Sequence, residues 1–270
     1  MNESLTRALS GIVYIILLIA STLYSEISFI VLFGLFMFLS VLEFCNLIKF
    51  SKIQALLLAA VFMLYTLFIP KSFQNNLILN CGAVFIGIIL LYDLFKQGNQ
   101  TGQLKNSAKI ALLIGYIIIP FTLLMKYPFI SDIEYNPYLI IGAFIIIWIN
   151  DTFAYLTGRA IGKHKLYEKI SPKKTIEGFL GGLVFALIGS YILSRFYTFQ
   201  SATVWMTGGT ILVIFGTLGD LVESKFKRTA GVKDSGNIMP GHGGILDRLD
   251  SIIFAIPFLF LYYQIINYVS

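Results

Sequence analysis

The sequence predicts an all-α, polytopic integral membrane protein with about nine transmembrane helices. Of its 270 residues, 57% are hydrophobic and only 13% are charged, and the mean hydropathy is +0.81. A soluble protein carries about 25% charged residues, so a soluble domain of this size could not bury so much apolar surface. The apolar residues also form runs of about 20, the length that a helix needs to cross a bilayer.

Nine apolar runs follow one another along the chain, separated by segments that contain Gly, Pro, Asn or clustered charge. They cover residues 8–25, 27–48, 53–69, 76–95, 108–125, 138–160, 177–196, 202–223 and 250–268. The first run lacks a convincing small-residue cleavage site, so we interpret it as a retained helix. We divide the chain into N-terminal membrane helices without an assigned role (1–135) and C-terminal membrane helices that carry the motifs below (136–270).

Lysine and arginine lie almost entirely in alternate connections. Seventeen of the twenty precede the first run or follow the second, fourth, sixth and eighth runs, and only Lys71, Lys126 and Arg195 lie in the other connections. Positive residues resist translocation, so the rich side is predicted to be cytoplasmic. We therefore expect a protein integral to the cell (inner) membrane, with a cytoplasmic N-terminus and an external C-terminus.

Composition also argues against several other classes of protein. The net charge of +6 is small and dispersed, so we expect no nucleic-acid partner. Cys45 and Cys81 lie inside apolar runs, which argues against a disulfide framework and against a cysteine-based zinc site.

Acidic residues inside apolar runs require an explanation, because an unpaired charge in hydrocarbon is costly. Glu43 and Asp93 lie a few residues from the cytoplasmic ends of their runs, and we interpret them as interfacial partners of Lys49 and Lys96. Asp151 lies well inside the sixth run. A role in a functional site is favoured there over a structural hydrogen bond to a neighbouring helix.

The densest polar region begins at the end of the eighth run. Helical spacing places on one face Asp220, Glu223, Ser224 and Lys227. The chain then continues to a glycine-rich turn at 240–244 and re-enters the membrane with Asp247, Arg248 and Asp250. Carboxylate oxygens are ligands that magnesium prefers, and glycine amides can approach a phosphate closely. The turn alone fits a plain loop, but together with the carboxylates it predicts a metal and phosphate site.

The connection before the seventh run carries Lys173, Lys174 and Thr175 directly ahead of Glu177. Lysine ammonium groups and hydroxyls bind phosphates as point charges and donors. The alternative interpretation is an ordinary positive cytoplasmic loop that contains a proline.

Several of these segments resemble the phosphatidate cytidylyltransferases, also called CDP-diacylglycerol synthases. The family signature is matched by residues 224–228, 233–236 and 240–250, which read SKFKR, KDSG and PGHGGILDRLD. Residues 150–155 and 171–178 are also similar to the family. Met239 stands where the family usually carries Ile, Leu or Phe, which is a conservative apolar change. The resemblance covers roughly residues 145–251, whereas the first five runs match no motif.

The resemblance implies that CTP and phosphatidic acid react at the bilayer surface to give CDP-diacylglycerol and pyrophosphate, with Mg²⁺ required. A homodimer is also expected. The implied metal ligands are Asp220 and Asp247, with Glu223 and Asp250 as the next candidates. The groups implied to hold the triphosphate or the lipid phosphate are Lys227, Arg228, Lys233 and Arg248, with Gly241, His242, Gly243 and Gly244 as the phosphate cradle. The polar cavity would be completed by Asp151, Lys173, Lys174, Thr175 and Ser224.

Two other functions stay open at this point. An ion-coupled transporter also has acidic residues within its spans, but we detect no inverted repeat, and the polar residues collect at one membrane face and not at the midplane. A CTP-dependent lipid kinase would share the nucleotide and the membrane, but it would transfer the terminal phosphoryl group. Analysis of the reaction products separates the three.

Overall fold

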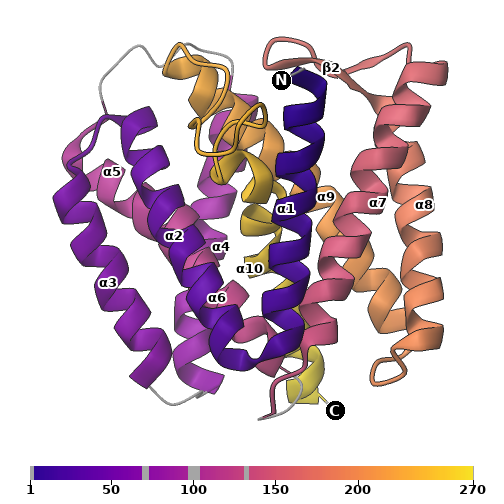
Figure 1. Ribbon diagram of the computed structural model, residues 1–270, viewed down its shortest axis with the longest axis horizontal. Helices are drawn as coiled ribbons and strands as arrows, with labels where there is room; N and C mark the ends of the chain where they lie inside the picture. The colour runs from indigo at the N-terminus through magenta and orange to yellow at the C-terminus, as the bar shows by residue number, and fades with distance from the viewer. Residues whose placement is uncertain (1–2, 69–72, 97–103, 131–133, 270) are drawn as a thin grey trace.

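The computed structural model describes residues 3–68, 73–96, 104–130 and 134–269. They form a bundle of long helices with a small hairpin at one end, and the N-terminus lies at the hairpin end and the C-terminus at the opposite end (Figure 1). The elements in chain order are α1 (Glu3–Tyr24), α2 (Glu26–Ile48), α3 (Lys52–Phe68), α4 (Phe73–Phe95), α5 (Asn106–Leu112), the π-helix η1 (Leu113–Ile118), α6 (Ile119–Lys126), the 3₁₀-helix η2 (Tyr127–Phe129), α7 (Pro137–Ile161), β1 (Lys165–Tyr167), β2 (Ser171–Thr175), α8 (Ile176–Phe196), α9 (Ala202–Thr229) and α10 (Leu246–Val269).

The prediction of an all-α membrane protein with about nine spans is confirmed. Among the described residues, eight helical stretches are long and apolar enough to cross a membrane, and α3 is a ninth, shorter apolar helix. The fifth predicted span is one continuous stretch made of α5, η1, α6 and η2. Strands β1 and β2 pair antiparallel, with Lys165 opposite Thr175.

Several helices extend beyond the predicted apolar runs, and two of these extensions carry site residues. Helix α9 continues to Thr229 and α10 begins at Leu246, whereas the apolar runs cover 202–223 and 250–268. The physical reason is that an apolar run stops at the first cluster of charge, but a helix does not. Side chains spaced at i, i+4 and i+7 continue one helical face, so the polar ends of both helices remain helical.

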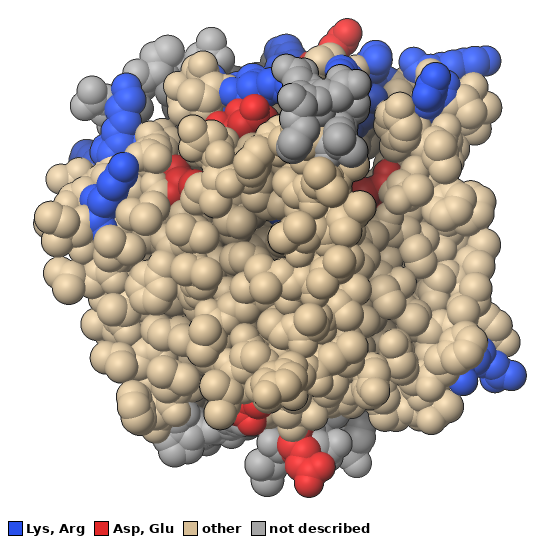
Figure 2. Space-filling view, in the orientation of Figure 1, with Lys and Arg blue, Asp and Glu red and all other residues tan. Residues whose placement is uncertain are grey.

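Charge is distributed asymmetrically along the bundle. Figure 2 shows lysine and arginine side chains gathered at the end where the N-terminus and the hairpin lie, with few at the opposite end. The predicted alternation of basic connections therefore corresponds to one end of the folded molecule.

Small residues bring α9 and α10 together at the polar end. A Cβ atom added at Gly219 would lie 2.5 Å from Cβ of Phe254 and 2.9 Å from the carbonyl oxygen of Asp250. Only glycine permits so close a crossing, as is common between helices in membranes. The crossing places Asp220, the next residue of α9, beside the turn of α10 that carries Asp250.

Helices of both halves of the sequence pack together. Helix α10 lies against α4 and α6 as well as against α9. Tyr116 of η1 stacks on Phe226 of α9 and meets Phe44 of α2 and Phe254 of α10 edge to face. Both halves of the sequence thus contribute to one aromatic cluster next to the polar end of α9. The division of the chain at residue 135 stays a prediction from the sequence.

Candidate active site

A buried ion-paired group joins the polar ends of α9 and α10. Lys227 pairs with Glu223, one helical turn before it, and its Nζ lies 2.7 Å from Oδ1 of Asp247. The side chains of Lys227, Glu223 and Asp247 are 11%, 0% and 4% exposed, respectively. The ammonium group of Lys227 therefore pairs with two carboxylates in a region from which solvent is largely excluded.

The second carboxylate oxygen of Asp247 holds the loop that precedes α10. It accepts hydrogen bonds from the amide and the hydroxyl of Ser235, both at 2.9 Å, and from the amide of Gly244 at 2.7 Å. Both oxygens of Asp247 therefore have protein partners. Its role as a metal ligand stays a prediction, and it requires that Lys227 or the loop release one of these oxygens.

Asp220 lies in a more open position, where the hairpin meets α9. Its Oδ2 is 2.6 Å from Nζ of Lys174, and its Oδ1 accepts a hydrogen bond of 3.2 Å from the hydroxyl of Ser224. The side chains of Lys174 and Asp220 are 28% and 34% exposed. Successive side chains of a strand point to opposite faces, so Lys174 of β2 reaches Asp220 while Lys173 is exposed to solvent.

Two further predicted carboxylates lie near this pair. Asp250 is buried beside α9 and interacts electrostatically with Asp220, Lys227 and Lys174. Asp151 of α7 interacts electrostatically with Lys174, Asp220 and Arg248. The structure therefore brings together from four elements the predicted residues Asp151, Lys174, Asp220, Glu223, Lys227, Asp247, Arg248 and Asp250. Carboxylates outnumber cations in this group.

The carboxylates of this group supply oxygen ligands of the kind that Mg²⁺ prefers. Among the residues that the structure describes, no group of three or more His, Cys, Asp or Glu side chains is arranged to hold a metal ion. Magnesium is, however, usually held by one or two carboxylates together with substrate phosphates and water. Asp250 fits such a site, because its protein donor in the described chain is the adjacent amide of Ser251. Asp220 fits it once Lys174 leaves Oδ2, which the partial exposure of both side chains allows. Within the described residues, the buried Oε1 of Glu223 has no hydrogen-bond partner.

The glycine-rich segment begins with a β-turn. The amide of His242 donates to the carbonyl oxygen of Met239 at 2.9 Å, and φ of Gly241 is +76°. Proline at the second position and glycine with positive φ at the third are typical of a type II turn. At Gly243, where φ is +88°, a Cβ atom would lie 2.6 Å from Oδ2 of Asp247.

Two of the four amides in this segment are already used. His242 donates to Met239 and Gly244 donates to Asp247, whereas the amides of Gly241 and Gly243 donate to no acceptor within the described chain. The predicted phosphate cradle therefore reduces to these two glycine amides.

Other predicted binding residues have different surroundings. Thr175 is buried and caps α8, where its hydroxyl accepts a hydrogen bond of 3.1 Å from the amide of Gly178. Arg228 donates to the carbonyl oxygen of Val232 at 3.0 Å and is exposed. The remaining cations Lys173, Lys233 and Arg248 are exposed at the same end of the molecule. These cations are free to meet a soluble polyanion, whereas Thr175 has a structural role at the helix start.

Glu43 belongs to the site, although the sequence had placed it at the interface with Lys49. Glu43 lies in α2, is 3% exposed, and accepts hydrogen bonds from the amides of Ile245 at 3.0 Å and Leu246 at 2.8 Å. Its Oε2 also lies 3.3 Å from the hydroxyl oxygen of Ser235, whose single proton is shared with the closer Oδ2 of Asp247. The carboxylate thus caps the start of α10, where the helix dipole favours negative charge. A glutamate inside an apolar run was the available signal, but its partners lie 192 to 203 residues further along the chain.

Asp93, the other acidic residue predicted to lie at the interface, also pairs with a residue far away in the sequence. Asp93 of α4 forms an ion pair of 2.6 Å with Lys225 of α9. This contact joins the polar ends of the two helices next to the site.

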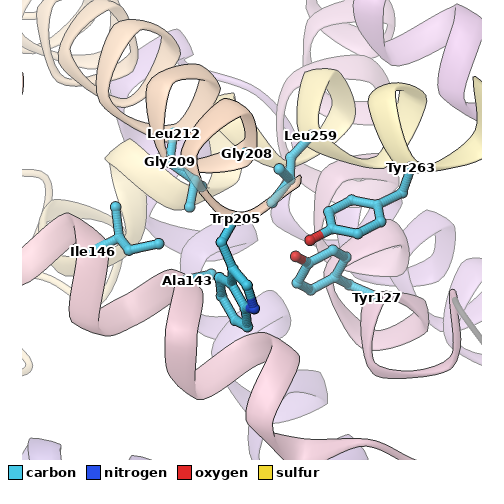
Figure 3. A pocket seen from close by; sticks show the side chains of 9 residues that line it. All are labelled: Tyr127, Ala143, Ile146, Trp205, Gly208, Gly209, Leu212, Leu259 and Tyr263. Carbon is cyan, nitrogen blue, oxygen red and sulfur yellow. The ribbon is translucent and has the colours of Figure 1, made fainter. Parts of the chain in front are cut away.

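A small cavity lies away from these residues. Its volume of about 10 Å³ is room for one water molecule. Figure 3 shows that its walls are largely apolar, with the hydroxyls of Tyr127 and Tyr263 turned toward each other and Trp205 beside them. None of the predicted site residues lines this cavity, so it is a packing defect of the helix bundle and not the substrate site.

Known proteins resemble this chain over almost its whole length. The model of the cytidylyltransferase family matches residues 5–266. Proteins named phosphatidate cytidylyltransferase are 38% identical in Staphylococcus saprophyticus, over 94% of this chain and 96% of the relative, and 40% identical in Staphylococcus haemolyticus, over 79% and 80%. A protein of the same name from Staphylococcus aureus is 57% identical over a segment that covers 44% of this chain and 46% of the relative. The chain belongs to the cytidylyltransferase family.

Proposed function

We propose that the protein transfers CMP from CTP to phosphatidic acid, giving CDP-diacylglycerol and pyrophosphate. The observation that carries the proposal is the group of carboxylates and lysines at the basic end of the bundle, in a chain whose relatives are named phosphatidate cytidylyltransferase. A lipid substrate reaches such a site from the bilayer and a nucleotide reaches it from water. An ion-coupled transporter is not favoured, because the polar residues collect at one end.

We infer that this end, together with the N-terminus, faces the cytoplasm of the cell. The inference is supported by the concentration of lysine and arginine there, since positive residues resist translocation. Single cysteines in a background without Cys45 and Cys81 test it. Exposed Glu168→Cys in the hairpin connection should react with an impermeant reagent only from inside, and exposed Thr198→Cys only from outside. Reaction of Glu168→Cys from outside would remove the site from the nucleotide's compartment.

The transfer itself needs a nucleophile, an electrophile and a leaving group. An oxygen of the lipid phosphate forms a bond to the α-phosphorus of CTP, and the bond from that phosphorus to the bridging oxygen of the β-phosphate breaks to release pyrophosphate. The second pKa of a phosphomonoester is about 6, so the attacking oxygen carries no proton near neutral pH. No general base is required, and catalysis rests on positioning and on neutralisation of charge.

We assign these tasks to particular side chains. The exposed cations attract and hold the triphosphate and the lipid phosphate, and they are Lys173, Arg228, Lys233 and Arg248. The amides of Gly241 and Gly243 donate to phosphate oxygens. Lys174 moves between Asp220 and the incoming phosphates, and Lys227 keeps Asp247 and the loop in place. Asp151 orients Lys174 and Arg248 electrostatically.

We further propose that Mg²⁺ is held by Asp220 and Asp250, with Glu223 and Asp247 next to them. When bound, the ion neutralises phosphate charge in the way that it does in other phosphoryl-group transfers. The carboxylates contribute hard oxygen ligands, and their excess over lysine and arginine in this group favours a cation.

The direct test is product analysis. Purified protein is incubated with CTP, magnesium and phosphatidic acid, and the expected products are pyrophosphate and a CMP-bearing lipid. Release of CDP with a newly phosphorylated lipid would instead identify a lipid kinase. The absence of turnover, with the protein folded and the lipid present, would refute the proposal. A homodimer and the lack of a nucleic-acid partner stay predictions.

A further inference from the structure

The loop that joins α9 to α10 is held by two helices of the N-terminal half, in which the sequence matched no motif. Glu43 of α2 binds the end of the loop next to α10. The turn at residues 239–242 lies against α1, and Figure 1 places the loop beside the N-terminal end of that helix. Helices α1 and α2 therefore contact opposite ends of the glycine-rich segment.

Ser10 makes the polar contact between α1 and the turn. Its hydroxyl oxygen lies 2.8 Å from Nδ1 of His242 and 3.0 Å from the carbonyl oxygen of Pro240. A serine hydroxyl has one proton and two lone pairs, so it can accept from a protonated Nδ1 while its own proton is shared by two carbonyl oxygens at 3.0 Å, that of Pro240 in the turn and that of Arg7 in α1. One side chain thus ties both the backbone and the imidazole of the turn to α1.

A glycine of each segment also lies close to a side chain of the other segment. A Cβ atom at Gly11 would lie 3.3 Å from Cε1 of His242, and one at Gly241 would lie 2.5 Å from Cγ of Arg7. The imidazole therefore lies over the α1 backbone at Gly11, and the turn passes under the stem of Arg7. Glycine on both sides of the contact gives it a shape that a larger residue would disrupt.

This contact is not explained by burial of α1 in the protein core. Only 17% of its span is buried, and the contacts of α1 elsewhere are chiefly with α2 and α7. A partly exposed hydrogen bond contributes little to the stability of the fold. We therefore attribute the contact between Ser10 and the turn to the need to hold the turn in one conformation.

We propose that α1 forms one wall of the active site and that Ser10 is a positioning residue, which acts through His242 and Pro240 on the amides of Gly241 and Gly243. The inference rests on the proposed function, because those amides are the groups assigned to the CTP phosphates. Ser10 itself contacts no substrate. It holds the turn in the conformation in which both glycine amides remain free to donate.

The first test compares Ser10→Ala with Ser21→Ala. Ser21 lies on the same helix, and its hydroxyl donates only to the carbonyl oxygen of Leu18 in that helix, at 3.1 Å. We expect Ser10→Ala to raise KM for CTP about three- to tenfold, the factor that corresponds to one hydrogen bond, and to leave KM for phosphatidic acid unchanged. Ser21→Ala should match the unmodified protein in both constants.

A shape test uses two glycines of membrane helices. Gly11→Val introduces bulk under the imidazole, whereas a Cβ atom at Gly82 of α4 would meet nothing within 4 Å. Gly11→Val should raise KM for CTP at least as much as Ser10→Ala, and Gly82→Val should not. The double variant Ser10→Ala/His242→Ala should be at most slightly worse than His242→Ala alone, because only the contact of Ser10 with Pro240 is then left to lose.

Hydrogen exchange of the backbone supplies a readout that does not depend on activity. Amides of Met239 and of residues 241–245 should exchange faster in Ser10→Ala than in Ser21→Ala, with the rest of the chain unchanged. If exchange and KM for CTP are the same in both variants, the inference is wrong. Faster exchange with unchanged KM would also overturn it, because the contact would then be structural only. If the unmodified protein lacks cytidylyltransferase activity, the proposed function fails, while the exchange result still decides whether Ser10 holds the turn.

Discussion

Replacing Lys227 by Met isolates the charge at the centre of the site, because Met keeps an unbranched apolar stem. Removing one partner of a buried ion pair costs about 3–5 kcal/mol, since it leaves a buried charge without compensation. Asp247 keeps three hydrogen bonds from Ser235 and Gly244 after the change, whereas Lys227 is the hydrogen-bond partner of Glu223. Lys227→Met should therefore lower the free energy of unfolding mainly by leaving the Glu223 carboxylate buried and unpaired. The double variant Glu223→Gln/Lys227→Met should regain most of the lost stability, because it removes that charge.

Lys225→Met is the matched control, two residues away on the same helix. Its partner is Asp93, and the two side chains are 25% and 32% exposed, so water screens the pair and its loss should cost about 0–1 kcal/mol. Thermal unfolding in detergent measures each variant. For a chain of this size roughly 2–4 °C corresponds to 1 kcal/mol, so Lys227→Met should unfold roughly 6–20 °C lower. Equal stability of the two single variants, or no recovery in the double variant, would refute this reasoning about buried charge.

Three further predictions concern single side chains. Asp220→Asn and Asp247→Asn should each abolish turnover while the protein still folds and inserts, because an amide is a weaker ligand and lacks the charge; exposed Glu168→Gln is the control, and near-normal activity at low magnesium would exclude that carboxylate as a ligand. Glu43→Gln should lower stability by about 1–3 kcal/mol and lower activity as well, because a side-chain amide cannot accept from both Ile245 and Leu246 without opposing an N–H group; unfolding as in the unmodified protein would contradict the capping role. Burial, together with Arg248 and Arg7, holds the pKa of His242 below its ordinary value of 6.5, so the unfolded chain binds a proton first as the pH falls. The stability advantage of the unmodified protein over His242→Gln should therefore shrink between pH 8 and pH 5.5, and His242→Gln should keep the acidic limb of the pH–rate profile; loss of that limb with unchanged magnesium affinity would make His242 the catalytic base.

Features of the protein that depend on local geometry could be predicted from the amino-acid sequence. Apolar runs of span length predicted the helices, because a helix in hydrocarbon satisfies all of its own backbone hydrogen bonds. Helical spacing predicted that Glu223 and Lys227 share a face, and they pair one turn apart. The sequence Pro240–Gly241 predicted a turn. Proline restricts φ at the second position of a type II turn, and glycine allows the positive φ that the third position needs.

Which distant groups come into contact depends on how the helices pack, and the sequence did not reveal it. Lys174 reaches Asp220 from the hairpin, Glu43 caps α10 from α2, and Ser10 binds the turn from α1. A membrane helix reveals from its sequence that a buried carboxylate needs a partner, but it does not reveal which neighbouring helix supplies one. That choice depends on how helices pack. At the site, Gly219 lets the backbones of α9 and α10 approach each other, and Gly11 leaves room on α1 for the imidazole of His242.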